Sequence, residues 1–333
     1  MEDILTKHYG LQPERSFKDG RAQRYMVEGS IYTIVNVTNM EQENLVELYT
    51  IAEHMKKYGD RFVSSFVPTT EGRFLVTEKE QDFTVLKNDQ HSRNSEARLG
   101  RKLAKFHQRG RVIEEKITHI SRIGQWKSLW EKRIEQMEKA FQLVIESHPG
   151  DEFERMFIDS CPYYLALAEN AVQYLVDTEM DDNPVYADSG TVCHERFVDG
   201  VWGGEVTIRN PFDWVFDHSG RDIAEHVRER YFQMQTTHQP DIQQFFRDYQ
   251  SVTPLSSFSW RLVYARLLFP LHYFETVENY YLSDSEGQHF QLGDRMQGYL
   301  NSTRHYERFL GSFYQVAEVP VKSFGIPGVT WLV

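Results

Sequence analysis

The chain has 333 residues, 40% of them hydrophobic and 14% aromatic, which is enough to bury a core in one large domain or in two lobes. Its 37 basic and 49 acidic side chains give a formal net charge of −12, which argues against nucleic acid or an anionic membrane surface as a partner. The two cysteines, Cys161 and Cys193, exclude a disulfide framework and are expected to be reduced and buried.

Targeting and membrane-spanning patterns are missing from the sequence. Residues 1–10 are mostly polar and lack the apolar core of a signal peptide. The longest near-apolar run, residues 262–271, is interrupted by Arg266 and is far shorter than the roughly 20 residues that span a bilayer. We therefore expect a protein that stays inside the cell that makes it.

The first ninety residues are rich in predicted strands. These cover residues 14–18, 24–28, 31–37, 62–69 and 73–77, with a short extended piece at 83–86. Asp19-Gly20 predicts a tight hairpin turn after the first strand. Apolar residues at helical spacing predict a helix over residues 43–58 that ends at Gly59. We expect a small lobe over residues 1–88, with a five-stranded antiparallel sheet and one helix.

The rest of the chain predicts mainly helices. They are expected over residues 95–109, 126–147, 152–178, 222–233, 242–249, 259–281 and 292–316. A block of strand and loop at residues 189–216 interrupts them and includes a short hairpin. We expect a large, mainly helical lobe over residues 89–333, joined to the small lobe by a polar linker at residues 87–91. The aromatic-rich residues 258–281 and 306–314 either fill the core or form a contact surface.

Residues 189–230, SGTVCHERFVDGVWGGEVTIRNPFDWVFDHSGRDIAEHVRER, resemble the catalytic core of aminoglycoside phosphotransferases and choline kinases. That family has the pattern C-H-G-D-x-x-x-x-N, a hairpin, I-D-[FW]-[DE], and then D-L-A at the start of a helix. His194 and the triplet Asp222, Ile223 and Ala224 match it. The resemblance implies an α+β, two-lobed, protein-kinase-like fold in which His194 and Asp222 tie the catalytic loop to the next helix. Asp222 also fits the N-cap of that helix.

Three further segments make the resemblance more specific. Residues 99–110, LGRKLAKFHQRG, are similar to the family helix L-x-x-x-L-A-x-F-H, and residues 163–175 resemble the helix before the catalytic loop. Residues 266–281, RLLFPLHYFETVENYY, resemble the signature of the bacterial spore coat CotS family, most of all its YutH branch. The resemblance implies synthesis in the mother-cell cytoplasm, deposition on the spore coat, and other coat proteins as partners.

Phosphoryl transfer needs a cation that holds the phosphates, a base and metal ligands, and this chain departs from the family at these positions. Asn36 stands where the resemblance places the phosphate-binding lysine of the third strand, and an amide lacks the positive charge. Arg196 replaces the aspartate that accepts the substrate proton, and a guanidinium cannot act as that base. Val201 replaces the asparagine that binds the second metal ion.

The aspartate that binds the bridging Mg²⁺ has two candidate positions. Residue type favours Asp213, whereas the spacing to the D-L-A motif favours Asn210. Asp213 is therefore the only candidate metal ligand, and one carboxylate is a weak Mg²⁺ site without phosphate oxygens. We expect no metal and no cofactor, with ATP and Mg²⁺ possible only in an active kinase.

Other polar residues of the expected cleft are interpreted as vestigial. Glu195 and Asp199 flank the Arg196 position and could in principle supply a displaced acid. Glu47 stands where the family has the partner of the missing lysine, and we expect it on a solvated helix face. The phosphate loop has a single glycine, Gly20, which is typical of a plain hairpin turn and not of a loop that surrounds phosphates.

These substitutions favour a catalytically degenerate phosphotransferase homologue that works as a structural or interaction protein of the endospore coat. One alternative is an active small-molecule kinase of the homoserine, choline or aminoglycoside type, using Asp213 and a displaced acid. Another is a pseudokinase that senses a nucleotide. The sequence does not separate the sensing hypothesis from the coat hypothesis, because in this fold adenine binds mainly backbone groups and apolar walls.

Overall fold

The computed structural model describes residues 2–20, 22–89, 92–93, 97–234 and 237–329. The chain forms two units from interleaved segments. Unit 1 contains Met1–Arg122, Ser189–His226 and Arg247–Thr253, and unit 2 contains Ile123–Asp188, Val227–Phe246 and Pro254–Val333. The lobe boundary between residues 88 and 89 lies within unit 1, so that boundary stays a prediction.

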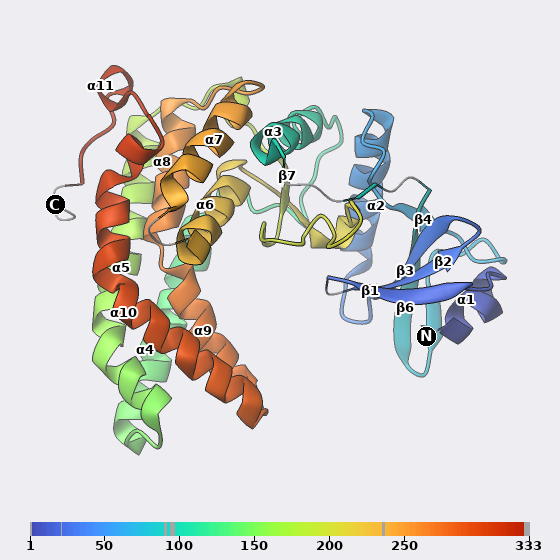
Figure 1. The fold of residues 1–333 in the computed structure, drawn as a ribbon, viewed down its shortest axis with the longest axis horizontal. Coiled ribbons are helices and arrows are strands. Elements are labelled where there is room, and N and C mark those ends of the chain that lie inside the picture. Colours follow the sequence, from blue (N-terminus) through green and yellow to red (C-terminus); the bar gives the residue numbers. More distant parts are fainter. Residues whose placement is uncertain (1, 21, 90–91, 94–96, 235–236, 330–333) are drawn as a thin grey trace. The chain divides into compact units, whose positions relative to one another are not determined.

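Unit 1 contains an antiparallel sheet of six strands in the order β1-β2-β3-β6-β4, with β5 also paired to β6 (Figure 1). The strands are β1 Arg15–Asp19, β2 Ala22–Val27, β3 Ser30–Asn36, β4 Ser65–Val67, β5 Val76–Glu78 and β6 Gln81–Asn88. The five-stranded prediction was wrong, because β6 is a full strand that pairs with three others. Its residues 83–86 are all buried, so the sequence lacks the alternation of a half-exposed strand.

Helix α1, Glu2–Tyr9, was not predicted. Its residues Ile4, Leu5 and Tyr9 are buried in a cluster with side chains of the sheet, among them Tyr32 and Val85. The mostly polar composition of residues 1–10 concealed this helix, because three apolar side chains are enough to attach it to the sheet.

The remaining elements of unit 1 position the candidate site. Helix α2 is Gln42–Lys57 and helix α3 is Leu99–Gly110. Strand β7, Thr191–His194, pairs antiparallel with β8, Trp214–Asp217. The separate hairpin expected between these two strands does not form, since residues 195–210 contain only isolated bridges at Val206 and Arg209. The short 3-10 helix η2, Pro211–Asp213, leads into β8, and helix α6, Gly220–Met234, follows it; the residues of α6 after His226 belong to unit 2. Of the predicted N-terminal end of α3, Ser95 and Glu96 lie outside the described residues.

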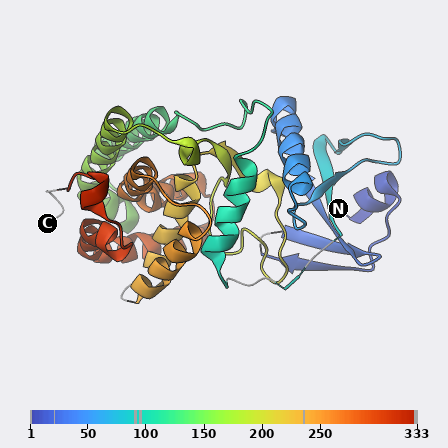
Figure 2. The same ribbon diagram turned by 90° about the horizontal axis from the view of Figure 1, so that it is seen from above.

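Unit 2 is helical, and several of its helices are seen nearly end-on in Figure 2. They are α4 Trp126–Ser147, α5 Glu152–Asp181, α7 His238–Gln250, α8 Ser257–Leu268, α9 Leu271–Leu282, α10 Glu286–Val316 and α11 Val321–Phe324; the last residues of α7 belong to unit 1. Helix α4 has its predicted bounds, α5, α7 and α10 differ from theirs by up to six residues at an end, and α11 was not predicted. The aromatic side chains of α8 and α9 are mostly buried, which supports the core interpretation of residues 258–281 over the contact-surface interpretation.

The single helix predicted over residues 259–281 is two helices, α8 and α9. Pro270 separates them, because proline has no N–H for a continuing helix. The buried Arg228 then donates through Nη2 to the carbonyl oxygens of Arg266 and, at 3.2 Å, Phe269. These bonds satisfy carbonyl groups that the end of α8 leaves without helical partners.

Both cysteines are free and buried, as predicted. Among the described residues, no helix combines the length and the apolar character that crossing a membrane would require.

Candidate functional site: the loop after strand β7

Asp222 is the centre of a buried hydrogen-bond network in unit 1. Its Oδ1 accepts the backbone N–H of His194 at 2.9 Å, and its Oδ2 lies 2.7 Å from His194 Nδ1 and 3.1 Å from His107 Nε2. Burial alone would raise the pKa of Asp222, but nearby His194 and the bonds from both rings hold that pKa well below its ordinary value. The predicted tie between catalytic loop and helix is therefore present.

The N-cap prediction for Asp222 was wrong. Helix α6 begins at Gly220, so Asp222 lies in its first turn and its carboxylate points at β7 instead of capping its own helix. The sequence could not separate the two roles, because an acidic residue suits both an N-cap and a first turn.

The tautomer of each histidine follows from its partners, and for His107 the acceptor Asp222 places the proton on Nε2. Trp202 Nε1 donates to His194 Nε2 at 2.8 Å, so the proton of His194 is on Nδ1 and is donated to Asp222. The hydroxyl of Tyr249 lies 2.8 Å from His107 Nδ1, and burial lowers the pKa of His107 to about 4. Both rings therefore act as structural hydrogen-bond partners in this network.

Among the described residues, His107, Cys193 and Asp222 could offer ligand atoms to one metal ion, since these atoms lie within 4.8 Å of one another. Cys193 Sγ is within hydrogen-bond distance of the carbonyl oxygens of Asp217 and His218, at 3.6 and 3.4 Å. Burial also raises the pKa of this thiol well above its ordinary value, whereas a metal requires the thiolate. The hydrogen bonds account for this cluster without a metal.

Arg196, which the sequence resemblance places at the position of the catalytic base, forms an ion pair. Its Nη2 lies 2.9 Å from Oε2 of Glu225, a buried residue of α6. Glu225 was not identified from the sequence, although its place three residues after Asp222 puts it on the same side of α6. A guanidinium here fixes the loop to the helix and cannot accept a proton.

Arg221, also missed, holds the loop from the other side. Its guanidinium donates to the carbonyl oxygens of His194 and Glu195 and to the carboxylate of Asp217, at 2.9, 3.0 and 3.0 Å. Burial alone would lower the pKa of Arg221, but the carboxylates of Asp217, Glu195 and Glu225 hold it above its ordinary value. Glu195 is exposed and its Oε1 lies 3.3 Å from Arg221, so this candidate displaced acid is ion-paired.

Asn36 and Val201 hold local structure. Asn36 is exposed at the end of β3, and its Oδ1 accepts the backbone N–H and the hydroxyl of Thr38 at 3.0 and 2.7 Å. Val201 lies in a turn and donates its N–H to the carbonyl of Val198 at 3.1 Å. The other candidate displaced acid, Asp199, is exposed in the same loop.

The two alternatives for the metal-binding position differ in environment. Asn210 accepts the N–H of Phe212 at 3.1 Å and so caps η2. The carbonyl of Asp213 accepts the N–H of Glu195 at 2.8 Å, and its carboxylate lies within electrostatic range of Arg24. Of the two candidates for the metal-binding position, Asp213 is therefore the one whose carboxylate interacts with the charge of Arg24.

Glu47 is buried, contrary to the solvated helix face expected for it. Its Oε1 accepts the N–H of Thr118 at 2.7 Å, and its Oε2 accepts those of His119 and Ile120, both at 2.9 Å. Burial alone would raise the pKa of Glu47, but these backbone bonds lower it below its ordinary value. Backbone N–H groups thus replace the lysine as the partner of this carboxylate.

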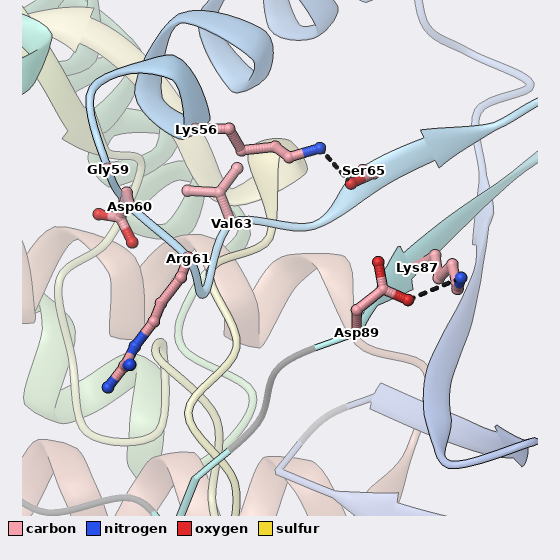
Figure 3. Close-up of a pocket in the computed structure, with 8 residues that line it drawn as sticks. All are labelled: Lys56, Gly59, Asp60, Arg61, Val63, Ser65, Lys87 and Asp89. Atoms are coloured by element: carbon pink, nitrogen blue, oxygen red, sulfur yellow. Dashed lines mark hydrogen bonds and ion pairs between the residues drawn. The ribbon is translucent and has the colours of Figure 1, made fainter.

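A polar pocket of about 240 Å³ lies in unit 1 (Figure 3). Its lining residues include none of the site residues discussed above. Lys56 points at Ser65, with Nζ 2.5 Å from Oγ, and Lys87 points at Asp89, with Nζ 2.6 Å from Oδ1 (Figure 3). Asp60 is bound by Arg109 and Arg209. The lining residues are Lys56, Gly59, Asp60, Arg61, Val63, Ser65, Lys87 and Asp89. Both acidic groups that line the pocket are therefore ion-paired.

Comparison with known proteins decides the family. Residues 2–313 match the family described as "Spore coat putative kinase YutH". The chain belongs to this family. It is 41% identical over 337 residues to the endospore coat-associated protein YutH of Bacillus subtilis (strain 168), with 100% of this chain and 98% of that protein covered. The CotS and YutH resemblance seen in the sequence is confirmed.

Solved structures place the YutH family member in the kinase-like fold. An aminoglycoside phosphotransferase from Alicyclobacillus acidocaldarius has a TM-score of 0.68 at 16% identity, covering 93% of this chain and 94% of that one. A spectinomycin phosphotransferase bound to AMP has a TM-score of 0.61 at 13% identity, covering 96% and 97%. A microcompartment-associated aminopropanol kinase has a TM-score of 0.58 at 12% identity, covering 95% and 97%. The predicted fold class is confirmed.

Proposed function

We propose that this YutH family member is a catalytically degenerate phosphotransferase homologue that works as a structural or interaction protein of the endospore coat. The observation that carries the proposal is Arg196 at the position of the catalytic aspartate, bound to the buried Glu225 at 2.9 Å. Without a base at that position, the substrate hydroxyl has no group to accept its proton. The local roles of Asn36 and Val201 support the same conclusion.

The coat role rests on kinship with the coat-associated YutH of Bacillus subtilis. Its partners would be other coat proteins, reached from the mother-cell cytoplasm. The proposal requires neither ATP nor Mg²⁺, since the hydrogen bonds around Asp222 hold the loop without a ligand.

The second candidate function is small-molecule phosphorylation. It is favoured by Asp213, whose carboxylate remains near the cation Arg24. A nucleotide-sensing pseudokinase would use the same pair for binding without turnover.

We expect no phosphoryl transfer from ATP to choline, homoserine or an aminoglycoside, because the base and the phosphate-binding lysine are both replaced. The measurement is ADP release with purified protein at saturating Mg²⁺, and Asp213→Ala is the control. Turnover that Asp213→Ala abolishes would establish the kinase alternative. Turnover that persists in Asp213→Ala would reveal a contaminating enzyme.

A fluorescent fusion in a sporulating cell tests the coat role. We expect the signal to surround the forespore, and we expect Asp213→Ala, which removes the candidate metal ligand, to leave that pattern unchanged, since the role does not depend on chemistry. A signal that stays diffuse throughout sporulation would contradict the coat role and leave only the fold in common.

A further inference from the structure

The carboxylate of Asp19, at the end of β1, is held as a bound anion would be. Its Oδ1 accepts the backbone N–H groups of Gly204 and Glu205 at 2.9 and 2.7 Å. Its Oδ2 lies 3.9 Å from Nε of Arg24, and the Asp19 side chain is fully buried. Two convergent backbone N–H groups and a guanidinium are the donors that proteins use for phosphate. The sequence had predicted only a plain hairpin turn here.

The segments that meet at Asp19 are those that the family resemblance assigns to phosphates and metal. Asp19 precedes the turn between β1 and β2, the position of the phosphate-covering loop. Gly204 and Glu205 closely follow Val201, the position of the metal-binding asparagine. Arg24 on β2 lies within electrostatic range of Asp213. The carboxylate of Asp19 therefore supplies a negative charge where the family resemblance places the phosphates.

The glycines of the partner loop are needed for this approach. Gly203 has a φ of +91°, and a Cβ there would lie 1.9 Å from the carbonyl oxygen of Val206. A Cβ on Gly204 would lie 3.0 Å from Oδ1 of Asp19. Side chains at these two positions would displace the loop, so its backbone is shaped around the carboxylate.

The carboxylate of Asp19 does not satisfy every hydrogen-bonding group around it. Among the described residues, neither Oδ2 of Asp19 nor Nε of Arg24 has a hydrogen-bond partner. Arg24 is otherwise oriented by Nη1, which donates to the hydroxyl of Thr33 on β3 at 2.5 Å. A tetrahedral anion has more oxygen atoms than a carboxylate and could satisfy Nε as well as both backbone groups.

We propose that Asp19 is a built-in substitute for phosphate, and that removing its carboxylate turns its surroundings into a binding site for a phosphoanhydride chain. The donors are the N–H groups of Gly204 and Glu205 and the guanidinium of Arg24. In the native chain this site is occupied, so free phosphates do not bind. The inference is independent of the coat role, because it concerns what the loop binds and not what the protein does on the spore.

The test uses the full chain and pyrophosphate as the probe, with binding measured by calorimetry at fixed ionic strength. We expect no measurable binding of pyrophosphate to the native protein. We expect Asp19→Ala to bind pyrophosphate with a dissociation constant at least tenfold below the limit set by the native protein. Asp19→Asn is the matched control, because its amide oxygen still accepts both N–H groups and keeps the site filled. Asp19→Ala combined with Arg24→Gln is expected to lose the binding again.

Thermal unfolding gives a second readout. Pyrophosphate is expected to raise the melting temperature of Asp19→Ala and leave that of the native protein unchanged, since a ligand of the native state stabilises it by mass action. Asp19→Ser serves if Asp19→Ala does not fold, and pyrophosphate is expected to restore cooperative melting to whichever variant is unstable. Equal binding by the native protein and Asp19→Ala, or no response in either variant, would overturn the proposal.

Comparing pyrophosphate with ADP and adenosine identifies the source of the phosphates. Equal affinity for pyrophosphate and ADP indicates a site for inorganic phosphate chains, and tighter binding of ADP indicates that an adenosine pocket also contributes. Both results support the role of Asp19. Binding of adenosine without pyrophosphate would contradict it.

Discussion

Replacing Asp222 by alanine is expected to lower the free energy of unfolding by at least about 3 kcal/mol, because three buried donors lose their acceptor and each unsatisfied buried group costs about 1–3 kcal/mol. The change leaves the N–H of His194 and two ring N–H groups without an acceptor in a site that water does not reach. An N-cap role, in contrast, would cost about 0.5–2 kcal/mol. Denaturant unfolding of the native protein and the variant measures the difference.

Asp241→Ala is the matched control for this prediction. Asp241 is also an acidic residue in the first turn of a helix, α7, but it is exposed. We expect its replacement to change stability by less than about 1 kcal/mol. Similar losses for Asp222→Ala and Asp241→Ala would show that helix position, and not the buried network, determines the role of Asp222.

The difference in stability between the native protein and Asp222→Ala should depend on pH. Because the pKa of Asp222 is lower in the folded state than the unfolded value of about 3.9, its stabilisation is complete above that value and is lost as the pH falls toward the folded pKa. The stability gap between the native protein and Asp222→Ala should therefore be constant above about pH 5 and narrow below about pH 4. A gap that widens in acid would contradict a charged Asp222.

Gly110→Ala is expected to cost about 3 kcal/mol, the upper end of overpacking penalties. A Cβ on this last residue of α3 would lie 2.5 Å from the backbone N of Val192 and 2.6 Å from Oγ1 of Thr191. The hydroxyl of Thr191 also donates to the carbonyl of His107 at 2.6 Å, so helix and strand cannot separate without losing this bond. The measurement is the melting temperature, together with the yield of soluble protein.

Gly298→Ala provides the opposite result as a control. Gly298 is an exposed residue of α10 with open space around its Cβ position. Alanine there should stabilise the helix by about 0.5–1 kcal/mol, because glycine loses more backbone entropy on folding. If both replacements changed the stability in the same direction, the close contact of α3 with β7 would not explain the effect of Gly110→Ala.

Much of this fold was accessible from the sequence, because its local signals agree with its tertiary structure. The spacing of apolar residues gave α4 its bounds, and the histidine and D-L-A motifs identified the bond between His194 and Asp222. The surroundings of several charged residues were not predicted. Glu47 was expected on a solvated helix face and Asp19 in a plain hairpin turn, since a single carboxylate gives no sign of the backbone N–H groups that will surround it.

The partners of the loop after β7 were missed for the same reason. Arg221 and Glu225 are charged residues on a helix, for which exposure to solvent is the usual outcome. Their burial depends on Asp217 and Arg196, which are brought near by the turn between β8 and α6 and by the loop after β7. Such pairings arise from tertiary structure, so neither periodicity nor motif spacing contains them.

The interleaved order of the chain segments has a consequence for biosynthesis. Helix α3 leaves the ribosome with His107 uncovered, because β7 and Tyr249, which enclose it, belong to segments made later. At about 5–20 residues per second, translation from His107 to Tyr249 takes on the order of ten seconds. The six-stranded sheet can form during that interval, but the network around Asp222 must wait. The nascent chain therefore exposes an incomplete surface that chaperones can recognise before unit 1 is closed.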